Sequence, residues 1–315
     1  MIHLPKNILV SLALKDGSGS PDDKWGDRDR VVLEQALLLA RHCKARVRVF
    51  HTVNLAEEAL VPQYDGIVSE ERALAEQALR EIIDSLSPEY RAQAQELSCA
   101  TGAGRPWYEA LREASVWGAD LIVLGPSVHD GFLDRILHGS TAGRLIRASA
   151  IPLWIVDSDR PSQIKRILVP IDLRPVSEEL VGLANQLHAA TGAERHLLHC
   201  LSFPLDISMH RHADAKTKLK EYHEQTLAAA EKRIDELLGS DRAGWKVTLR
   251  QDAVTRAVPE LIAEHNIDLL LIAGVSLPRI AGVLLGTTAE KILSKIHAPS
   301  YVIKPAGWKS PVQFD

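Results

Sequence analysis

"RILVPIDL" (Arg166–Leu173) repeats a pattern that the chain already contains in "NILVSLAL" (Asn7–Leu14). Each segment has a short apolar run, Ile8–Leu12 or Ile167–Ile171, which is typical of a buried strand. The two segments are 159 positions apart, and each precedes an amphipathic helix pattern. The similarity indicates an internal repeat.

The repeat continues well beyond this first strand. "ADLIVLG" (Ala119–Gly125) matches "IDLLLIA" (Ile267–Ala273) with an offset of 148, and the same offset holds over about 80 residues. After the following loop the offset becomes 147, because the first loop is one residue longer. An accidental match would not keep one offset for so long. We therefore predict two homologous domains, residues 1–158 and 163–315.

Each copy has the same order of predicted elements, βαβαβαβαβ. This order requires a mostly parallel sheet with helices on both faces. We therefore predict an α/β fold with two tandem, doubly wound, five-stranded parallel sheets. Gly192 is the expected C-cap of the first helix in the second copy. Later helices are expected at Glu70–Leu86, Pro106–Trp117, Lys216–Leu238 and Ala257–His265.

The composition is that of a soluble globular protein, with 46% hydrophobic and 25% charged residues among 315. The net charge is −4 and no block of lysine or arginine stands out, which disfavours a nucleic-acid partner. The apolar segment Leu269–Gly286 has Ser276, Pro278 and Arg279 at its middle, so strand and loop are favoured over a membrane span. Three cysteines without paired spacing, and no signal-peptide pattern, indicate a cytoplasmic protein.

The segment "AGVSLPRIAGVLLGTTAE" (Ala273–Glu290) is the candidate binding loop. It follows a predicted strand and ends in the small-residue turn Gly286-Thr287-Thr288 at the start of a helix. In doubly wound sheets, ligands bind beyond the carboxyl ends of the strands, where the strand order reverses. That point lies between the first and fourth strands, which end at Asp172 and Ala273 in the second copy.

These motifs resemble the universal stress protein family, in its tandem two-domain form, over nearly the whole chain. The family motif is Gly, two residues, Gly, nine residues and then Gly-Ser/Thr, together with an Asp at the end of the first strand. Ala273 and Ser276 replace two of the glycines in the second copy, but the spacing is intact. The resemblance implies a nucleotide site made of Pro170, Asp172, Ala273, Ser276, Arg279, Gly286, Thr287 and Thr288.

The first copy matches the motif less well. Gly125 and Gly139-Ser140-Thr141 are present, but Val128 stands at the second glycine position and Ala13 replaces the Asp. The loop is also one residue too long. The resemblance therefore implies a degenerate nucleotide site in the first domain and a better preserved one in the second.

The expected ligand is ATP or another adenine nucleotide, and no cofactor is expected to be required. Backbone N–H groups and hydroxyls at Gly286-Thr287-Thr288 would bind phosphate at a helix start. Asp172 would accept hydrogen bonds from the ribose or the adenine edge, and Arg279 would add a charge-assisted phosphate contact. The alternative is that Gly-Thr-Thr only caps the last helix and that Arg279 is solvated.

The expected function is binding and regulation in the stress response, without turnover and without catalytic or metal-binding residues. An ATP-hydrolysing enzyme would need a metal-binding carboxylate and a water-activating base near the loop, and neither is evident. Val128, Leu277 and Ile280 make the two loops more apolar than a phosphate site needs. An apolar, lipid-like ligand therefore stays open as an alternative.

The remaining expectations concern association and histidines. In the family the last strand makes the dimer contact, so Ile151–Val156 and Ser300–Lys304 are expected to pair as an internal pseudo-dimer. A homodimer of the whole chain stays open. His51 and His199 are equivalent in the two copies, which favours a structural role. "MHRHAD" (209–214) is interpreted as an exposed polar loop and not as a metal site.

Overall fold

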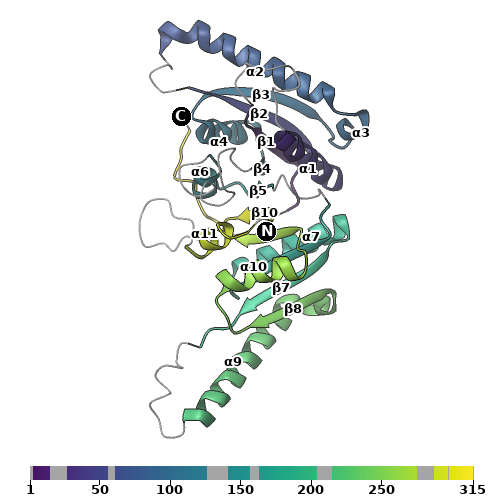
Figure 1. Cartoon of the computed structure of the whole chain (residues 1–315), viewed down its shortest axis with the longest axis vertical. Helices are drawn as coiled ribbons and strands as arrows, with labels where there is room; N and C mark the ends of the chain where they lie inside the picture. Colours follow the sequence, from purple (N-terminus) through teal and green to yellow (C-terminus); the bar gives the residue numbers. More distant parts are fainter. Residues whose placement is uncertain are drawn as a thin grey trace.

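The computed structural model describes residues 3–14, 27–55, 61–125, 141–156, 163–203, 215–274, 287–296 and 298–314. The strands in these residues form one ten-stranded sheet in the order β3-β2-β1-β4-β5-β10-β9-β6-β7-β8 (Figure 1). All neighbouring strands are parallel except β5 and β10. The strands are β1 (Asn7–Leu12), β2 (Arg46–Asn54), β3 (Leu97–Gly104), β4 (Leu121–Leu124), β5 (Leu153–Ile155), β6 (Arg166–Ile171), β7 (Glu194–Cys200), β8 (Trp245–Arg250), β9 (Leu269–Ala273) and β10 (Ser300–Ile303).

Helices cover both faces of the sheet. Buried residues of α1, α2, α7 and α9 form a core on one face, and those of α4, α6, α10 and α11 form a core on the other. This arrangement confirms the predicted doubly wound α/β class. The helices are α1 (Asp27–Cys43), α2 (Asp65–Ser85), α3 (Pro88–Arg91), α4 (Pro106–Trp117), α6 (Thr141–Ala148), α7 (Val176–Thr191), α9 (Ala215–Leu238), α10 (Val254–Glu264) and α11 (Thr287–Leu293), with short 3-10 turns at Pro62–Tyr64 and Gly239–Gly244.

Local sequence accounts for most of these elements. All four residues of β4 are buried because helices pack on both faces of this central strand. Gly192 ends α7 with a φ of 75°, a left-handed conformation that glycine adopts without steric cost, and its N–H donates to His188 O. Helix α4 has the bounds expected from the sequence, Pro106–Trp117.

The two halves join through β5 and β10. In this antiparallel ladder Trp154 pairs with Tyr301, and each is 2% exposed. The two residues are equivalent in the repeat, 147 positions apart, so the contact uses the same surface from each half. The expected pairing of the last strands is confirmed, and it merges two five-stranded sheets into one continuous sheet.

Further contacts between the halves lie beside this ladder. Arg147 on α6 donates to Glu290 on α11, with Nη2–Oε1 at 3.1 Å. The segment after β10 runs back over the first half (Figure 1). There Ser310 donates its hydroxyl to Ala148 O at 2.7 Å, and the Phe314 ring meets Tyr108 edge-on at 5.4 Å between centroids.

The repeat is visible in equivalent hydrogen bonds. Asp120 accepts from the backbone N–H groups of Lys6 and Asn7, and Asp268 accepts from the two equivalent residues in the second half. The Nδ1 atoms of His51 and His199 each lie 3.0 Å from the carbonyl oxygen at the end of the neighbouring first strand. These contacts agree with a structural role for both histidines. Among the described helices, none is both long and apolar enough to cross a membrane.

Candidate functional site

The carboxyl edge of β6 and β9 is the predicted binding region of the second half. The β6–β9 ladder contains only the pairs Ile167–Leu269 and Leu168–Leu270. In the first half the equivalent ladder has four pairs and continues to Ser11, the residue equivalent to Pro170. Proline has no N–H to donate to the neighbouring strand. Pro170 therefore ends the ladder early and leaves the two strands unpaired at the switch point of the sheet.

Asp172 directly follows β6 at this opening. Its Oδ1 accepts from the Arg174 N–H at 3.0 Å and lies 3.5 Å from the Ser177 hydroxyl. Its side chain is 52% exposed, with Oδ2 3.4 Å from Arg174 Nε. The carboxylate is thus oriented by the turn into α7, and among the described residues Oδ2 has only the exposed Arg174 side chain beside it.

The turn that holds Asp172 is itself fixed from another helix. Leu173 has a φ of 59°, an unusual conformation for a residue with a branched side chain. Its carbonyl accepts from Arg233 on α9 at 2.8 Å. The long helix α9 therefore supports the strand-to-helix turn at the site.

The first half arranges this position differently. Ala13 stands where the second half has Asp172, as the sequence comparison showed. A carboxylate is nevertheless present, because Asp29 on α1 accepts from the Ala13 N–H at 3.4 Å. Sequence reasoning missed this, since the acidic residue comes from the following helix and not from the strand end.

The structure describes only part of the predicted binding loop. Ala273 ends β9, and the next N–H, that of Gly274, donates to Ile303 O at 2.8 Å. Thr287 and Thr288 begin α11, with Thr288 exposed. Ser276, Arg279 and Gly286 lie outside the described residues, as do the residues behind the apolar-ligand and polar-loop interpretations, namely Val128, Leu277, Ile280 and 209–214.

Lys304 is a buried cation at the same edge of the sheet that sequence reasoning missed. It follows β10, which pairs with β9, and the residue is 8% exposed. Its Nζ lies 4.8 Å from the centre of the Trp308 ring and has no hydrogen-bond partner among the described residues. Burial lowers the pKa of Lys304 to about 8, against the opposing effect of Glu290. The sequence signal that could have identified this residue is a lysine directly after the apolar strand β10.

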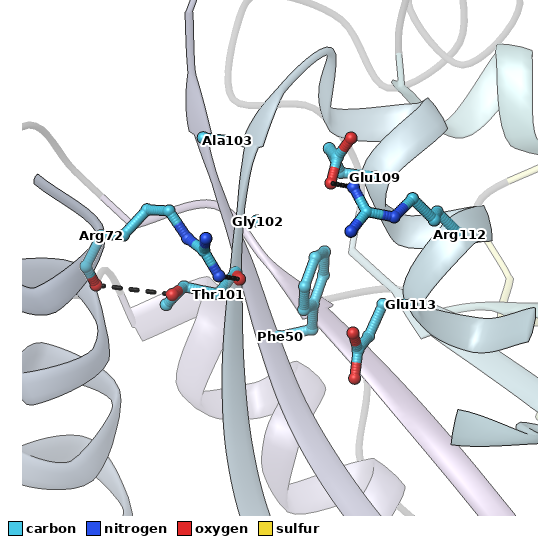
Figure 2. Close-up of a pocket in the computed structure, with 8 residues that line it drawn as sticks. All are labelled: Phe50, Arg72, Thr101, Gly102, Ala103, Glu109, Arg112 and Glu113. Atoms are coloured by element: carbon cyan, nitrogen blue, oxygen red, sulfur yellow. Dashed lines mark hydrogen bonds and ion pairs between the residues drawn. The ribbon is translucent and has the colours of Figure 1, made fainter. Parts of the chain in front are cut away.

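A polar cavity in the first half was also missed. It lies beside the edge strand β3, between α2 and α4, and is lined mainly by charged and polar groups (Figure 2). No motif marks these residues, because they are separated in the sequence and only packing brings them together. In the part of the chain that the structure describes, no group of three His, Cys, Asp or Glu residues is placed to hold a metal ion.

Comparisons with known proteins agree with the repeat. The model of the universal stress protein family matches residues 26–157 and again residues 163–304. The chain is 24% identical over 230 residues to Universal stress protein E of Escherichia coli K12, which covers 67% of this chain and 69% of that protein. It is 30% identical over 188 residues to the Na(+)/H(+) antiporter NhaS5 of Synechocystis, which covers 59% of this chain but only 24% of the antiporter.

The fold is also found among solved structures. A putative universal stress protein from Pseudomonas aeruginosa UCBPP-PA14 superposes with a TM-score of 0.67 and 17% identity, covering 96% of this chain and 94% of that one. A universal stress protein from Archaeoglobus fulgidus superposes with a TM-score of 0.65 and 19% identity, covering 95% and 96%. At these identities the similarity establishes the tandem fold alone.

Proposed function

This chain belongs to the universal stress protein family, and we propose that it is a regulatory protein that binds an adenine nucleotide in its second domain. The two domains in this proposal are residues 1–158 and 163–315. The ligand acts by binding and not by turnover. Its occupancy changes the association of the protein with partners, by favouring one arrangement of the loop over others.

The observation that carries the proposal is the early end of the β6–β9 ladder, at the pair Leu168–Leu270. Pro170 interrupts the ladder at the switch point, and Asp172 stands at its carboxyl end with its side chain 52% exposed. Switch points of doubly wound sheets are where ligands bind. The first half keeps a complete ladder and lacks the strand-end Asp, so the same comparison favours the second half.

The roles of the residues follow from their chemistry. Asp172 accepts hydrogen bonds from the ribose hydroxyls through Oδ2, while Oδ1 keeps the turn in place. The loop from Ala273 through Ser276 and Arg279 to Gly286-Thr287-Thr288 supplies backbone N–H groups, hydroxyls and one guanidinium to the phosphates. Alanine and serine are small enough to let phosphate approach the backbone, at a cost in affinity if their φ must be positive.

Isothermal titration calorimetry with ATP and ADP tests this proposal. Asp172→Ala should weaken binding about tenfold or more, because a hydrogen bond to a charged group is lost. Asp84→Ala is the matched control, since Asp84 is an exposed carboxylate whose only described partner is Arg91 at 3.7 Å. Indistinguishable titrations of the wild type and Asp172→Ala would count against the site.

Two alternative functions are separated by measurements on the same protein. Native mass spectrometry of freshly purified protein would detect a co-purified apolar ligand. Release of inorganic phosphate from ATP at a constant rate per protein, abolished in Asp172→Ala, would identify a weak ATPase. Binding of ATP and ADP without either result supports a regulatory binding protein.

A further inference from the structure

The polar cavity of the first half has a volume of about 130 Å³ and lies beside the carboxyl-terminal half of β3. Figure 2 shows Arg72 of α2 on one side of the strand and Glu109, Arg112 and Glu113 of α4 on the other, with the Phe50 ring between them. Strands β1 and β2 separate β3 from the switch point between β1 and β4. The cavity is therefore separate from the predicted nucleotide sites of both halves.

The repeat explains why the first half has this cavity. Gly102 on β3 is equivalent to Arg250 on β8, 148 positions later. In the second half, Arg250 reaches from the strand to α10 and donates to Glu260 at 2.8 Å and to Glu264 at 2.9 Å. In the first half this position of the strand has no side chain, because residue 102 is glycine. A Cβ on Gly102 would lie 2.9 Å from the Phe50 ring and 3.0 Å from Glu109 Oε2, so glycine is needed there.

The helix wall of the cavity also has the opposite charge in the two halves. Arg112 on α4 is equivalent to Glu260 on α10. In the second half the cation Arg250 on the strand meets the anion Glu260 on the helix. In the first half the helix has the cation Arg112, and the equivalent strand position is Gly102, which has no side chain. Arg112 has a partner on its own helix, Glu109 at 3.3 Å, and an anion bound in the cavity would take the place opposite Arg112 that Arg250 has opposite Glu260.

The charged side chains around the cavity have one more positive than negative charge, which one bound anion would balance. Arg48 and Glu113 form a closed pair at 2.8 Å. Arg72 donates to Thr101 O at 2.7 Å, and Arg112 donates to Glu109 at 3.3 Å. Within the described residues these are the only hydrogen bonds of the Arg72 and Arg112 guanidinium groups, so most of their N–H donors are free. Arg112 thus faces one remaining carboxylate, that of Glu109, and Arg72 lines the same cavity from the other side of the strand.

We propose that this cavity binds a small monocarboxylate, with its carboxylate on the guanidinium groups of Arg72 and Arg112 and its short carbon chain against the Phe50 ring. Planar carboxylates match the donor geometry of guanidinium groups in pairs. The volume accommodates an acid of a few carbon atoms and excludes a nucleotide. The first domain would then sense a small organic acid, independently of the second domain.

Glu109 links this binding to pH. Its side chain is 12% exposed, and burial raises the pKa of Glu109, with Glu113 of the same helix acting in the same direction and Arg112 and Arg72 opposing it. A carboxylate ligand raises this pKa further, because it is a second negative charge. Glu109 then takes up a proton on binding and donates a hydrogen bond to the ligand. Affinity is expected to increase as pH falls, within the range where the ligand stays ionised.

The test is a titration of the full chain with propionate, followed through the amide NMR signals of Gly102 and Ala103 at constant ionic strength. The wild type should show saturable shifts with a dissociation constant in the millimolar range, and the neutral propionamide should show none. Arg72→Gln and Arg112→Gln should each weaken binding about tenfold, and both residues are exposed, so neither variant threatens the fold. Lys220→Gln is the matched control, because Lys220 is the equivalent of Arg72 on α9.

Other outcomes contradict the proposal. Equal shifts with propionamide would exclude a charge-based site, and equal weakening by Lys220→Gln would indicate a general effect of surface charge. Phosphate that binds as tightly as propionate would show a site for any oxyanion and not for carboxylates. Glu109→Gln imitates the protonated acid and should bind propionate with no pH dependence. A wild-type affinity that is unchanged by pH, or a pH dependence that persists in Glu109→Gln, would refute the role of Glu109.

Discussion

Trp154 and Tyr301 face each other across the only antiparallel ladder in the described sheet, and each is the counterpart of the other in the repeat. The pairs on either side, Ile155–Ser300 and Leu153–Val302, are related by the same pseudo-two-fold axis. A homodimer forms such a self-complementary contact between two chains. Here one chain supplies both surfaces, and the apolar edges that would otherwise be exposed are buried in the middle of the sheet.

Removing the hydroxyl of Tyr301 is expected to stabilise the protein. The Oη atom is buried and has no hydrogen-bond partner among the described residues, so its desolvation is not compensated. Tyr301→Phe should raise the free energy of unfolding by roughly 1 kcal/mol or more. Tyr301→Ala should lower it by about 3–5 kcal/mol, because a large cavity is left between the halves. Urea denaturation of both variants checks this, and a destabilised Tyr301→Phe would show that the hydroxyl has a partner.

Lys304 should make stability depend on pH. Its pKa is about 8 in the folded protein and 10.5 in the reference state, so the folded state binds fewer protons than the unfolded state between these values. The free energy of unfolding therefore rises with pH from about 8 to 10.5, and the full cost of burial is present below pH 8. Lys304→Met should remove this dependence and stabilise the protein at pH 7 by on the order of 3 kcal/mol, which is 2.5 pKa units at about 1.4 kcal/mol each.

The control for Lys304→Met is Lys291→Met, which replaces an exposed lysine on α11. Urea unfolding at pH 7 and pH 10 would be compared for both variants and the wild type. The interpretation fails if the two variants change the pH dependence equally.

Pro170→Ser should extend the β6–β9 ladder. It copies Ser11, which pairs with Leu124 in the first half, and it restores the missing N–H donor. Hydrogen exchange should show protection of the residue 170 amide and new protection of the Ala273 amide, and nucleotide affinity should fall because the two strands become paired at the switch point. Unchanged exchange at these amides would mean that another feature holds the strands apart.

The ion pair of Arg147 and Glu290 should couple the two halves. Their side chains are 22% and 24% exposed, so solvent screens the pair only partly. A double-mutant cycle with Arg147→Met and Glu290→Gln should give a coupling free energy of about 1 kcal/mol, which falls as salt is added. A coupling free energy near zero would mean that the β5–β10 ladder and the apolar contacts alone hold the two halves together.

Much of the fold was predictable because the relevant information is local or repeated. The apolar run of β4, the C-cap at Gly192 and the bounds of α4 depend on residues a few positions apart. Because the two copies align with a nearly constant offset, a strand or helix predicted in one half could also be predicted at the equivalent residues of the other. Part of the candidate site was predictable for the same reason, since Asp172 and Ala273 had to end neighbouring strands.

Other features required the coordinates. Pro170 was predicted as part of a motif, but its effect on the ladder depends on the partner strand, 100 residues further on at Leu270. Lys304 could be identified as a buried cation only from the structure, which places it directly after β10 with 8% exposure. The cavity at Gly102 combines residues of two strands and two helices, and no periodicity in the sequence relates Arg72 to Glu109.

The amino-acid sequence by itself determined the order of strands and helices, because hydrophobic period and turn residues are properties of neighbouring positions. A constant offset between distant positions revealed the duplication, and the family resemblance added the strands at which the halves meet. The tertiary structure alone decided which polar groups are removed from water, namely Lys304 and the Tyr301 hydroxyl, which has no hydrogen-bond partner among the described residues. It also brought together the residues of the arginine-lined cavity. Their energies depend on burial and on contacts between residues far apart in the chain, and both are set only when the helices pack on the sheet.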